Sequence, residues 1–106
     1  MNDDLCLNML KNKLESFYDL TFYSDEERER YNEKIKFELV DFIISSYKNE
    51  HIDLVKKGLD LLFDNSGSHF DFAFLKKAKP LFIKNGVIDE KLFEDYLKKS
   101  PLSRWL

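Results

Sequence analysis

The chain of 106 residues has the length of one ordinary domain, and its 43% hydrophobic and 15% aromatic content excludes an intrinsically disordered protein. Only three Gly and two Pro are present, which leaves little material for tight turns and favours helices. The net charge of −3 is uneven, because residues 1–53 hold 13 acidic and 7 basic residues whereas residues 54–106 hold 7 and 10. This asymmetry bears on binding partners rather than on the fold.

The first predicted helix has one apolar face, formed at steps of three, four and three by Leu7, Leu10, Leu14 and Phe17. Acidic residues near the N-terminus favour the positive end of its dipole. A short connector is expected at residues 20–23.

The second predicted helix covers residues 25–48 and is expected to be central. A capping box begins it, since Ser24 can accept a hydrogen bond from the backbone N–H of Glu27 and Glu27 can reach back. Its polar residues recur only as a narrow stripe, at Lys34, Glu38, Asp41, Ser45 and Lys48. A helix that is apolar nearly all round is buried by neighbours on several sides.

A third helix is predicted over about residues 51–63, followed by a loop at "DNSGS". Its expected inner face consists of Ile52, Val55, Leu59, Leu62 and Phe63. Gly58 in a helix interior costs about 1 kcal/mol relative to Ala. We therefore expect Gly58 to permit a close helix crossing.

Two further helices complete the prediction. Ser68 is expected to cap the fourth, whose apolar face is Phe70, Phe74, Ala78 and Phe82. Pro80 lacks an N–H and should kink or split this helix, and Gly86 suits a left-handed end. Asp89 is expected to cap the fifth helix and Pro101 to end it. The inner face of the fifth helix is predicted to be Leu92, Phe93, Tyr96 and Leu97.

These elements predict an all-α fold, a compact single domain over residues 1–106 with about five helices packed around residues 25–48. The acidic start "MNDDLC" and the lack of a long apolar stretch predict neither a signal peptide nor a membrane span. Cys6 is the only cysteine, so no internal disulfide is possible. A reduced, cytoplasmic setting fits these features best.

The sequence contains no pattern typical of a catalytic site. A nucleophile such as Cys6 or Ser68 would need a base and an orienting acid nearby. The only histidines, His51 and His69, have no spacing that supplies them. Asp71 beside His69, and Asp60 with Asp64, are interpreted as acids of a solvated face rather than as converging metal ligands. No Gly-rich phosphate loop is present. We expect no enzymatic activity, no metal and no cofactor.

A basic run leaves one alternative open, a small regulatory or adaptor protein that contacts nucleic acid. The run consists of Lys76, Lys77, Lys79 and Lys84. Interleaved Phe residues could stack on bases, but Phe70 and Phe74 follow helical spacing and are better interpreted as core. Because arginine is scarce and the net charge is negative, we do not expect nucleic-acid binding.

The stretch "FYDLTFYSDEERERY", residues 17–31, combines aromatic and acidic residues at the start of the central helix. Aromatic residues anchor interfaces, and surrounding acids steer a basic partner. The predicted partner-binding residues are Tyr18, Asp19, Tyr23, Asp25, Glu26 and Glu29, with Glu38 and Asp41 as a second acidic candidate. The alternative is that the aromatics only fasten the first two helices together; both hold if Phe22 faces inward and Tyr23 outward. Trp105 either fills the core or docks on a partner.

In size, helical content and acidity the whole chain resembles small bacterial toxin-immunity proteins, including those of contact-dependent growth inhibition systems. The resemblance is one of general character and rests on no motif, so it carries over no residue roles. It implies an immunity protein that neutralises a cognate toxin by direct binding. Nucleases are common basic targets because they must bind phosphates. The expected partner is therefore a basic toxin or nuclease domain.

Overall fold

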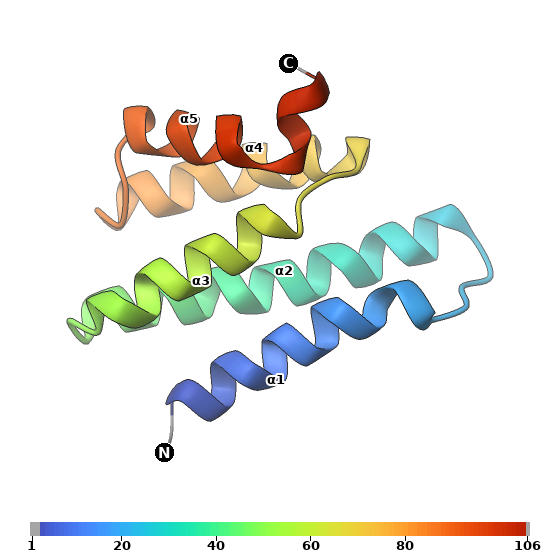
Figure 1. Ribbon diagram of the computed structural model, residues 1–106, viewed down its shortest axis with the longest axis horizontal. Helices are drawn as coiled ribbons and strands as arrows, with labels where there is room; N and C mark the ends of the chain where they lie inside the picture. Colours follow the sequence, from blue (N-terminus) through green and yellow to red (C-terminus); the bar gives the residue numbers. More distant parts are fainter. Residues whose placement is uncertain (1–2, 106) are drawn as a thin grey trace.

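Helices account for most of the chain in the computed structural model, which describes residues 3–105 except the side chains of Asp3, Tyr18, His69 and Trp105 (Figure 1). Seven elements follow one another: α1 (Asp3–Ser16), η1 (Phe17–Asp19), α2 (Asp25–Lys48), α3 (Ile52–Asp64), α4 (His69–Lys84), α5 (Glu90–Lys99) and η2 (Pro101–Trp105). The elements η1 and η2 are short 3-10 helices. No strand occurs within residues 3–105, so the predicted all-α class is confirmed.

Helix α2 is the central element, as predicted. It contacts α1, α3 and α4, while α5 packs on α3 and on η2 (Figure 1). Its inward residues Leu39, Val40 and Ile43 are completely buried. The core continues into every other α-helix through Leu10, Leu14, Val55, Leu59, Leu62, Phe63, Phe74, Ala78, Phe82 and Phe93.

The N-terminal cap of α2 forms with one difference from the prediction. Ser24 Oγ accepts a hydrogen bond from the backbone N–H of Glu27 at 3.2 Å, as expected. Glu27 reaches back one residue further than predicted, because its Oε2 accepts from the N–H of Tyr23 at 3.2 Å. The cap therefore fixes the backbone of Tyr23 as well as the start of the helix.

Gly58 allows α3 to approach α2 closely. A Cβ atom added at Gly58 would lie 2.6 Å from Cγ1 of Ile43, which is far inside van der Waals contact. Ile43 is completely buried, so its side chain has little room to move. The predicted role of Gly58 in a close crossing is confirmed.

Two predicted inner-face residues are wrong. Ile52 is 48% exposed and Leu92 is 42% exposed. Each lies in the first turn of its helix, α3 or α5, where the neighbouring elements leave that side uncovered. Periodicity identifies the face of a helix but not how far along its length a neighbour covers that face.

The ends of α4 and α5 follow local rules. Helix α4 continues unbroken through Pro80, so of the two predicted outcomes the split is wrong, while the kink stays a prediction. Pro80 is exposed, and so is Lys76, whose carbonyl loses its helical donor there. Gly86 adopts φ +74° after α4, and Asp89 Oδ1 accepts from the N–H of Leu92 at 2.8 Å to cap α5. Both of these predictions are confirmed.

No helix within residues 3–105 is long and apolar enough to span a lipid bilayer.

Candidate functional site

The exposed start of α2 brings together most of the predicted partner-binding residues. We define the acidic edge as Asp19, Tyr23, Asp25, Glu26 and Glu29, all of which are exposed. Tyr23 is 100% exposed, although its backbone is held by Glu27. The side chain of Tyr18 lies outside the described residues. The acidic edge occupies the end of the molecule where α1 and α2 meet, at the right of Figure 1.

The acidic edge continues along one face of α2. Glu26, Glu29, Arg30 and Glu33 follow one another on this face at helical steps. Beyond them, Lys77 of α4 lies 2.6 Å from Oε1 of Glu33 and ties the two helices together. This face of α2 therefore carries three acidic residues and one basic residue.

The second acidic candidate lies apart from the acidic edge. Glu38 is twelve residues beyond Glu26, a separation of about 18 Å along a helix that rises 1.5 Å per residue. Its Oε2 accepts a hydrogen bond from Lys13 of α1 at 3.1 Å. Asp41 is exposed almost one turn further along. The structure thus separates these two residues from the other predicted site residues.

An aromatic cluster supports the acidic edge from inside. The ring centroid of Phe22 lies 5.6 Å from that of Phe17 and 5.5 Å from that of Tyr31. The guanidinium carbon of Arg28 lies 5.7 Å from the centre of the Phe22 ring. Phe22 is half-buried whereas Tyr23 is fully exposed, so the expected division between an inward and an outward aromatic is confirmed.

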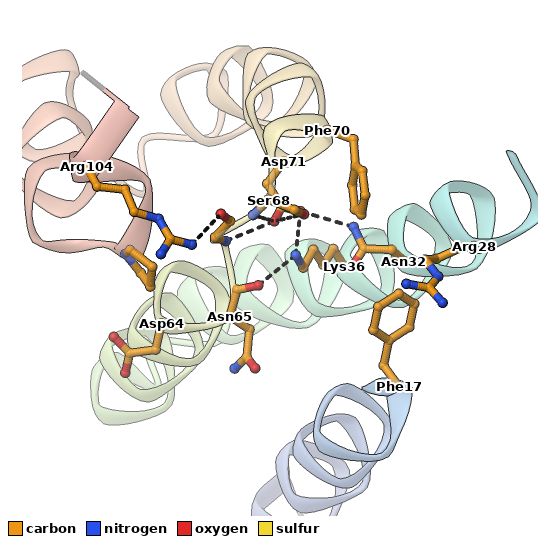
Figure 2. A pocket seen from close by; sticks show the side chains of 12 residues that line it. Phe17, Arg28, Asn32, Lys36, Asp64, Asn65, Ser68, Phe70, Asp71 and Arg104 are labelled. Atoms are coloured by element: carbon orange, nitrogen blue, oxygen red, sulfur yellow. Dashed lines mark hydrogen bonds and ion pairs between the residues drawn. The ribbon is translucent and has the colours of Figure 1, made fainter. Parts of the chain in front are cut away.

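A buried ion pair lies beside the middle of α2 (Figure 2). Lys36 Nζ is 2.6 Å from Oδ1 of Asp71, and each side chain is only 2% exposed. Lys36 also donates to the carbonyl of Asn65 at 2.8 Å, and Asn32 Nδ2 donates to Oδ1 of Asp71 at 3.0 Å. The pair joins α2 to the start of α4 through the interior.

Asp71 also closes the loop between α3 and α4. Its Oδ2 accepts from the N–H groups of Gly67 and Ser68 at 3.0 Å each, and from the hydroxyl of Ser68 at 2.9 Å. Asp71 is the third residue of α4, the position from which a carboxylate can reach back to the cap. The carboxylate thus receives five hydrogen bonds in total, counting those from Lys36 and Asn32.

Opposing effects act on the two charges. Burial favours a raised pKa for Asp71, but the Lys36 charge and the hydrogen bonds from Lys36, Ser68 and Asn32 outweigh it and lower the pKa below 3.8. For Lys36, burial is the largest effect and lowers the pKa below 10.5, against the attraction of Asp71. At neutral pH Asp71 is therefore a carboxylate with a full set of donors.

The lowered pKa of Asp71 predicts how its contribution to stability depends on pH. Because the folded-state pKa lies below the unfolded value, the contribution is fully present above the unfolded pKa and is lost as pH falls through the folded pKa. The difference in unfolding free energy between the wild type and Asp71→Asn should therefore shrink below about pH 4. Urea unfolding followed by circular dichroism at several pH values measures it. A difference that stays constant down to about pH 2 would contradict the prediction.

Sequence reasoning missed this network. Asp71 was interpreted as part of a solvated face, which is wrong because its side chain is buried. Two signals point to it: Ser68 and Asp71 have capping-box spacing, and Asn32 and Lys36 continue the inward face of α2 at helical steps. The pairing itself joins residues 35 positions apart, which no local pattern reveals.

A pocket of about 430 Å³ lies over the ion pair (Figure 2). Phe17 and Phe70 provide apolar surface, and the exposed Arg28 and Arg104 approach from different elements. Arg104 Nη2 donates to the carbonyl of Gly67 at 3.4 Å. The remaining lining residues are Asn32, Lys36, Asp64, Asn65, Ser68, Asp71 and Pro101.

Two of the four lysines in the basic run on α4 form ion pairs within the fold, whereas Lys76 and Lys84 are exposed. Lys77 pairs with Glu33 at 2.6 Å, and Lys79 lies within 4 Å of acidic groups on α5, those of Glu90 and Glu94. Phe74 is buried in the core, as predicted, and is not available to stack on a base. Phe70 is half-buried and lines a pocket outside the core, so its prediction as a core residue is wrong.

Of the groups considered for catalysis or metal binding, Cys6 and His51 lie on separate elements, whereas Ser68, His69 and Asp71 share the start of α4. Cys6 is half-buried on α1, and His51 is exposed at the start of α3. The side chains of His69 and Trp105 fall outside the described residues. Among the residues that the structure describes, no three His, Cys, Asp or Glu side chains cluster closely enough to hold a metal ion.

Comparison with known proteins identifies no relative. No protein-family model, no curated protein and no solved structure matches the chain. The geometry of the acidic edge and of the pocket is therefore the basis for a functional proposal.

Proposed function

We propose that this protein is a non-enzymatic inhibitor that binds a basic protein through the acidic edge. Tyr23 carries this proposal, because it is 100% exposed while its backbone is fixed by Glu27. Tyrosine supplies a large, amphipathic contact surface and is enriched among the residues that dominate binding energy. Its neighbour Phe22 provides the aromatic contact between the first two helices, which leaves the side chain of Tyr23 fully exposed.

The contacts that hold the chain around Tyr23 in place favour binding, because they reduce the conformational entropy that is lost when a complex forms. The Ser24 cap and the cluster of Phe17, Phe22 and Tyr31 fix the chain on both sides of Tyr23. An anchor held in place before binding loses less conformational entropy when the complex forms. The acidic edge is thus a preorganised surface.

Charge favours a basic partner. The four acids around Tyr23 are exposed, and residues 1–53 carry 13 acidic against 7 basic residues. A concentrated negative field accelerates encounter with a positive surface. A nuclease presents such a surface because it binds phosphates.

The finer proposal is a bacterial immunity protein that neutralises its cognate toxin in the cytoplasm. It rests on the resemblance in size, helical content and acidity to such proteins. In this role the acidic edge would cover the phosphate-binding surface of a nuclease toxin and block access of the nucleic acid. The alternative of nucleic-acid binding through α4 is weakened by the pairing of Lys77 and Lys79 with acids.

Affinity capture from the native host tests the proposal. The immobilised wild type is expected to retain a basic protein, and Tyr23→Ala should weaken its binding by about 30-fold, the effect of losing an interface anchor. Leu92→Ala, at another exposed apolar residue, is the matched control and should bind as the wild type does. A captured partner that is acidic, or that binds Tyr23→Ala as tightly as the wild type, would refute the proposal.

A further inference from the structure

We propose that the pocket between α2, the α3–α4 loop and η2 binds a small aromatic anion, a flat ring that bears one carboxylate or phosphate group. None of the five residues of the acidic edge lines this pocket, so the inference goes beyond the proposed function; Phe17 and Arg28 belong both to the pocket and to the aromatic cluster beneath the edge. The pocket volume of about 430 Å³ falls within the range of about 300–1,000 Å³ typical of small-molecule sites. It admits one or two rings with a small substituent.

The side chains that form the floor of the pocket are held in place by hydrogen bonds to one another. Lys36, Asn32, Ser68 and the backbone of Gly67 all donate to the carboxylate of Asp71. Among the described residues, every buried side-chain polar atom has a hydrogen-bond partner. A ligand therefore meets a surface that needs no rearrangement of its floor, which limits the cost of binding.

The charge of the pocket favours an anion. Lys36 and Asp71 neutralise each other in the floor, and the carboxyl group of Asp64 points away from Lys36 and Arg28 (Figure 2). Arg28 and Arg104 lie on opposite sides of the buried pair (Figure 2). The lining thus presents positive charge in a chain whose net charge is −3.

The presence of two arginines in this pocket indicates the kind of ligand, because arginine is scarce in this chain. Of its 17 basic residues only three are arginines, and two of them line this pocket. A guanidinium group binds carboxylate or phosphate through two parallel hydrogen bonds and also stacks on flat rings, whereas a lysine ammonium acts as a point charge. Two guanidinium groups therefore suit a ligand that is both planar and anionic.

The apolar part of the pocket is the reason for proposing a ring in the ligand. Phe17 and Phe70 line it from two different elements, and Pro101 adds a third apolar surface. Aromatic and apolar walls stabilise a flat ring by burial and stacking. An inorganic anion would leave these walls unused.

Titration of the 15N-labelled protein with two probes tests the proposal. The probes are phenyl phosphate, an aromatic phosphate, and indole-3-acetate, an aromatic carboxylate; inorganic phosphate is the control without a ring. At least one aromatic probe is expected to shift the amide signals of Gly67, Ser68 and Asp71, and to bind at least about tenfold more tightly than inorganic phosphate. Binding of phenyl phosphate alone identifies a phosphate ligand, and binding of indole-3-acetate alone a carboxylate ligand.

Matched arginine variants assign the binding to the pocket. Arg28→Gln and Arg104→Gln should each weaken the binding of the successful probe about tenfold. Arg30→Gln changes an equally exposed arginine of α2 that lies outside this pocket, and should leave affinity unchanged. The proposal fails if neither aromatic probe shifts these signals, if phosphate binds as tightly as both probes, or if Arg30→Gln weakens binding as much as Arg28→Gln.

Discussion

Asp71→Ala is expected to destabilise the protein by about 3–5 kcal/mol, because it leaves a buried charge without its partner. The Lys36 ammonium would keep one hydrogen bond, to the carbonyl of Asn65. The donors of Asn32, Gly67 and Ser68 would also lose their acceptor, and the start of α4 would lose its reach-back contact. Unsatisfied buried donors add to the cost.

Lys36→Met should cost less, about 1–3 kcal/mol. Methionine approximates the apolar stem of lysine, and the Asp71 carboxylate would retain four hydrogen bonds. Lys77→Ala is the matched control, since its ion pair with Glu33 is also 2.6 Å long but Lys77 is 58% exposed. This control should cost less than about 1 kcal/mol. Urea unfolding measures the change in unfolding free energy for all three variants. A larger destabilisation by Lys36→Met than by Asp71→Ala would contradict the conclusion that Asp71 is the more important member of the pair.

Gly58→Ala is expected to destabilise the protein by about 1–3 kcal/mol through overpacking, although Ala is the better helix former. The added Cβ would approach Cγ1 of Ile43 to 2.6 Å, so either this buried side chain or the helix pair must shift. Local helix propensity alone predicts the opposite sign, a gain of about 1 kcal/mol.

An Ile43→Ala background separates the two effects. Ile43→Ala by itself should cost about 2–5 kcal/mol, because it empties a completely buried site. In this background Gly58→Ala meets no Cγ1 atom and should become stabilising by up to about 1 kcal/mol. A double-mutant cycle in urea measures the coupling. Additive costs in the cycle would show that the helix crossing does not depend on this contact.

Local chemistry made much of the fold predictable. Helix α2 has the predicted limits, residues 25–48, because the Ser24 cap and the narrow polar stripe are both patterns of residues that lie close together in the sequence. The end of α4 at Gly86 and the cap of α5 at Asp89 follow from single residues in the same way. Features determined within a few residues of one another are accessible to pattern reasoning.

Features that depend on distant contacts were not predictable. The pairing of Lys36 with Asp71 requires α4 to begin beside the middle of α2, and no sequence pattern in either segment indicates this arrangement. The exposure of Ile52 and Leu92 depends on where neighbouring elements stop. The acidic edge was accessible because Tyr23 and its acids are close in sequence, whereas the pocket draws residues from α2, the α3–α4 loop and η2.

Stopped-flow association of the captured basic partner with the Glu26→Lys, Glu29→Lys double variant is the most direct test of docking through the acidic edge. Both residues are exposed, so the free energy of unfolding should fall by no more than about 1 kcal/mol, the cost of reversing the charge of Glu26 in the first turn of α2. Ser24→Ala is the control for the cap: it should lower stability by about 1 kcal/mol. Because it changes no charge, it should leave the salt dependence of the association rate unchanged. At low salt the double variant should associate about tenfold or more slowly than the wild type, and the difference should shrink at physiological salt because rim charges act on encounter. Equal association rates for the double variant and the wild type at low salt would contradict the docking role.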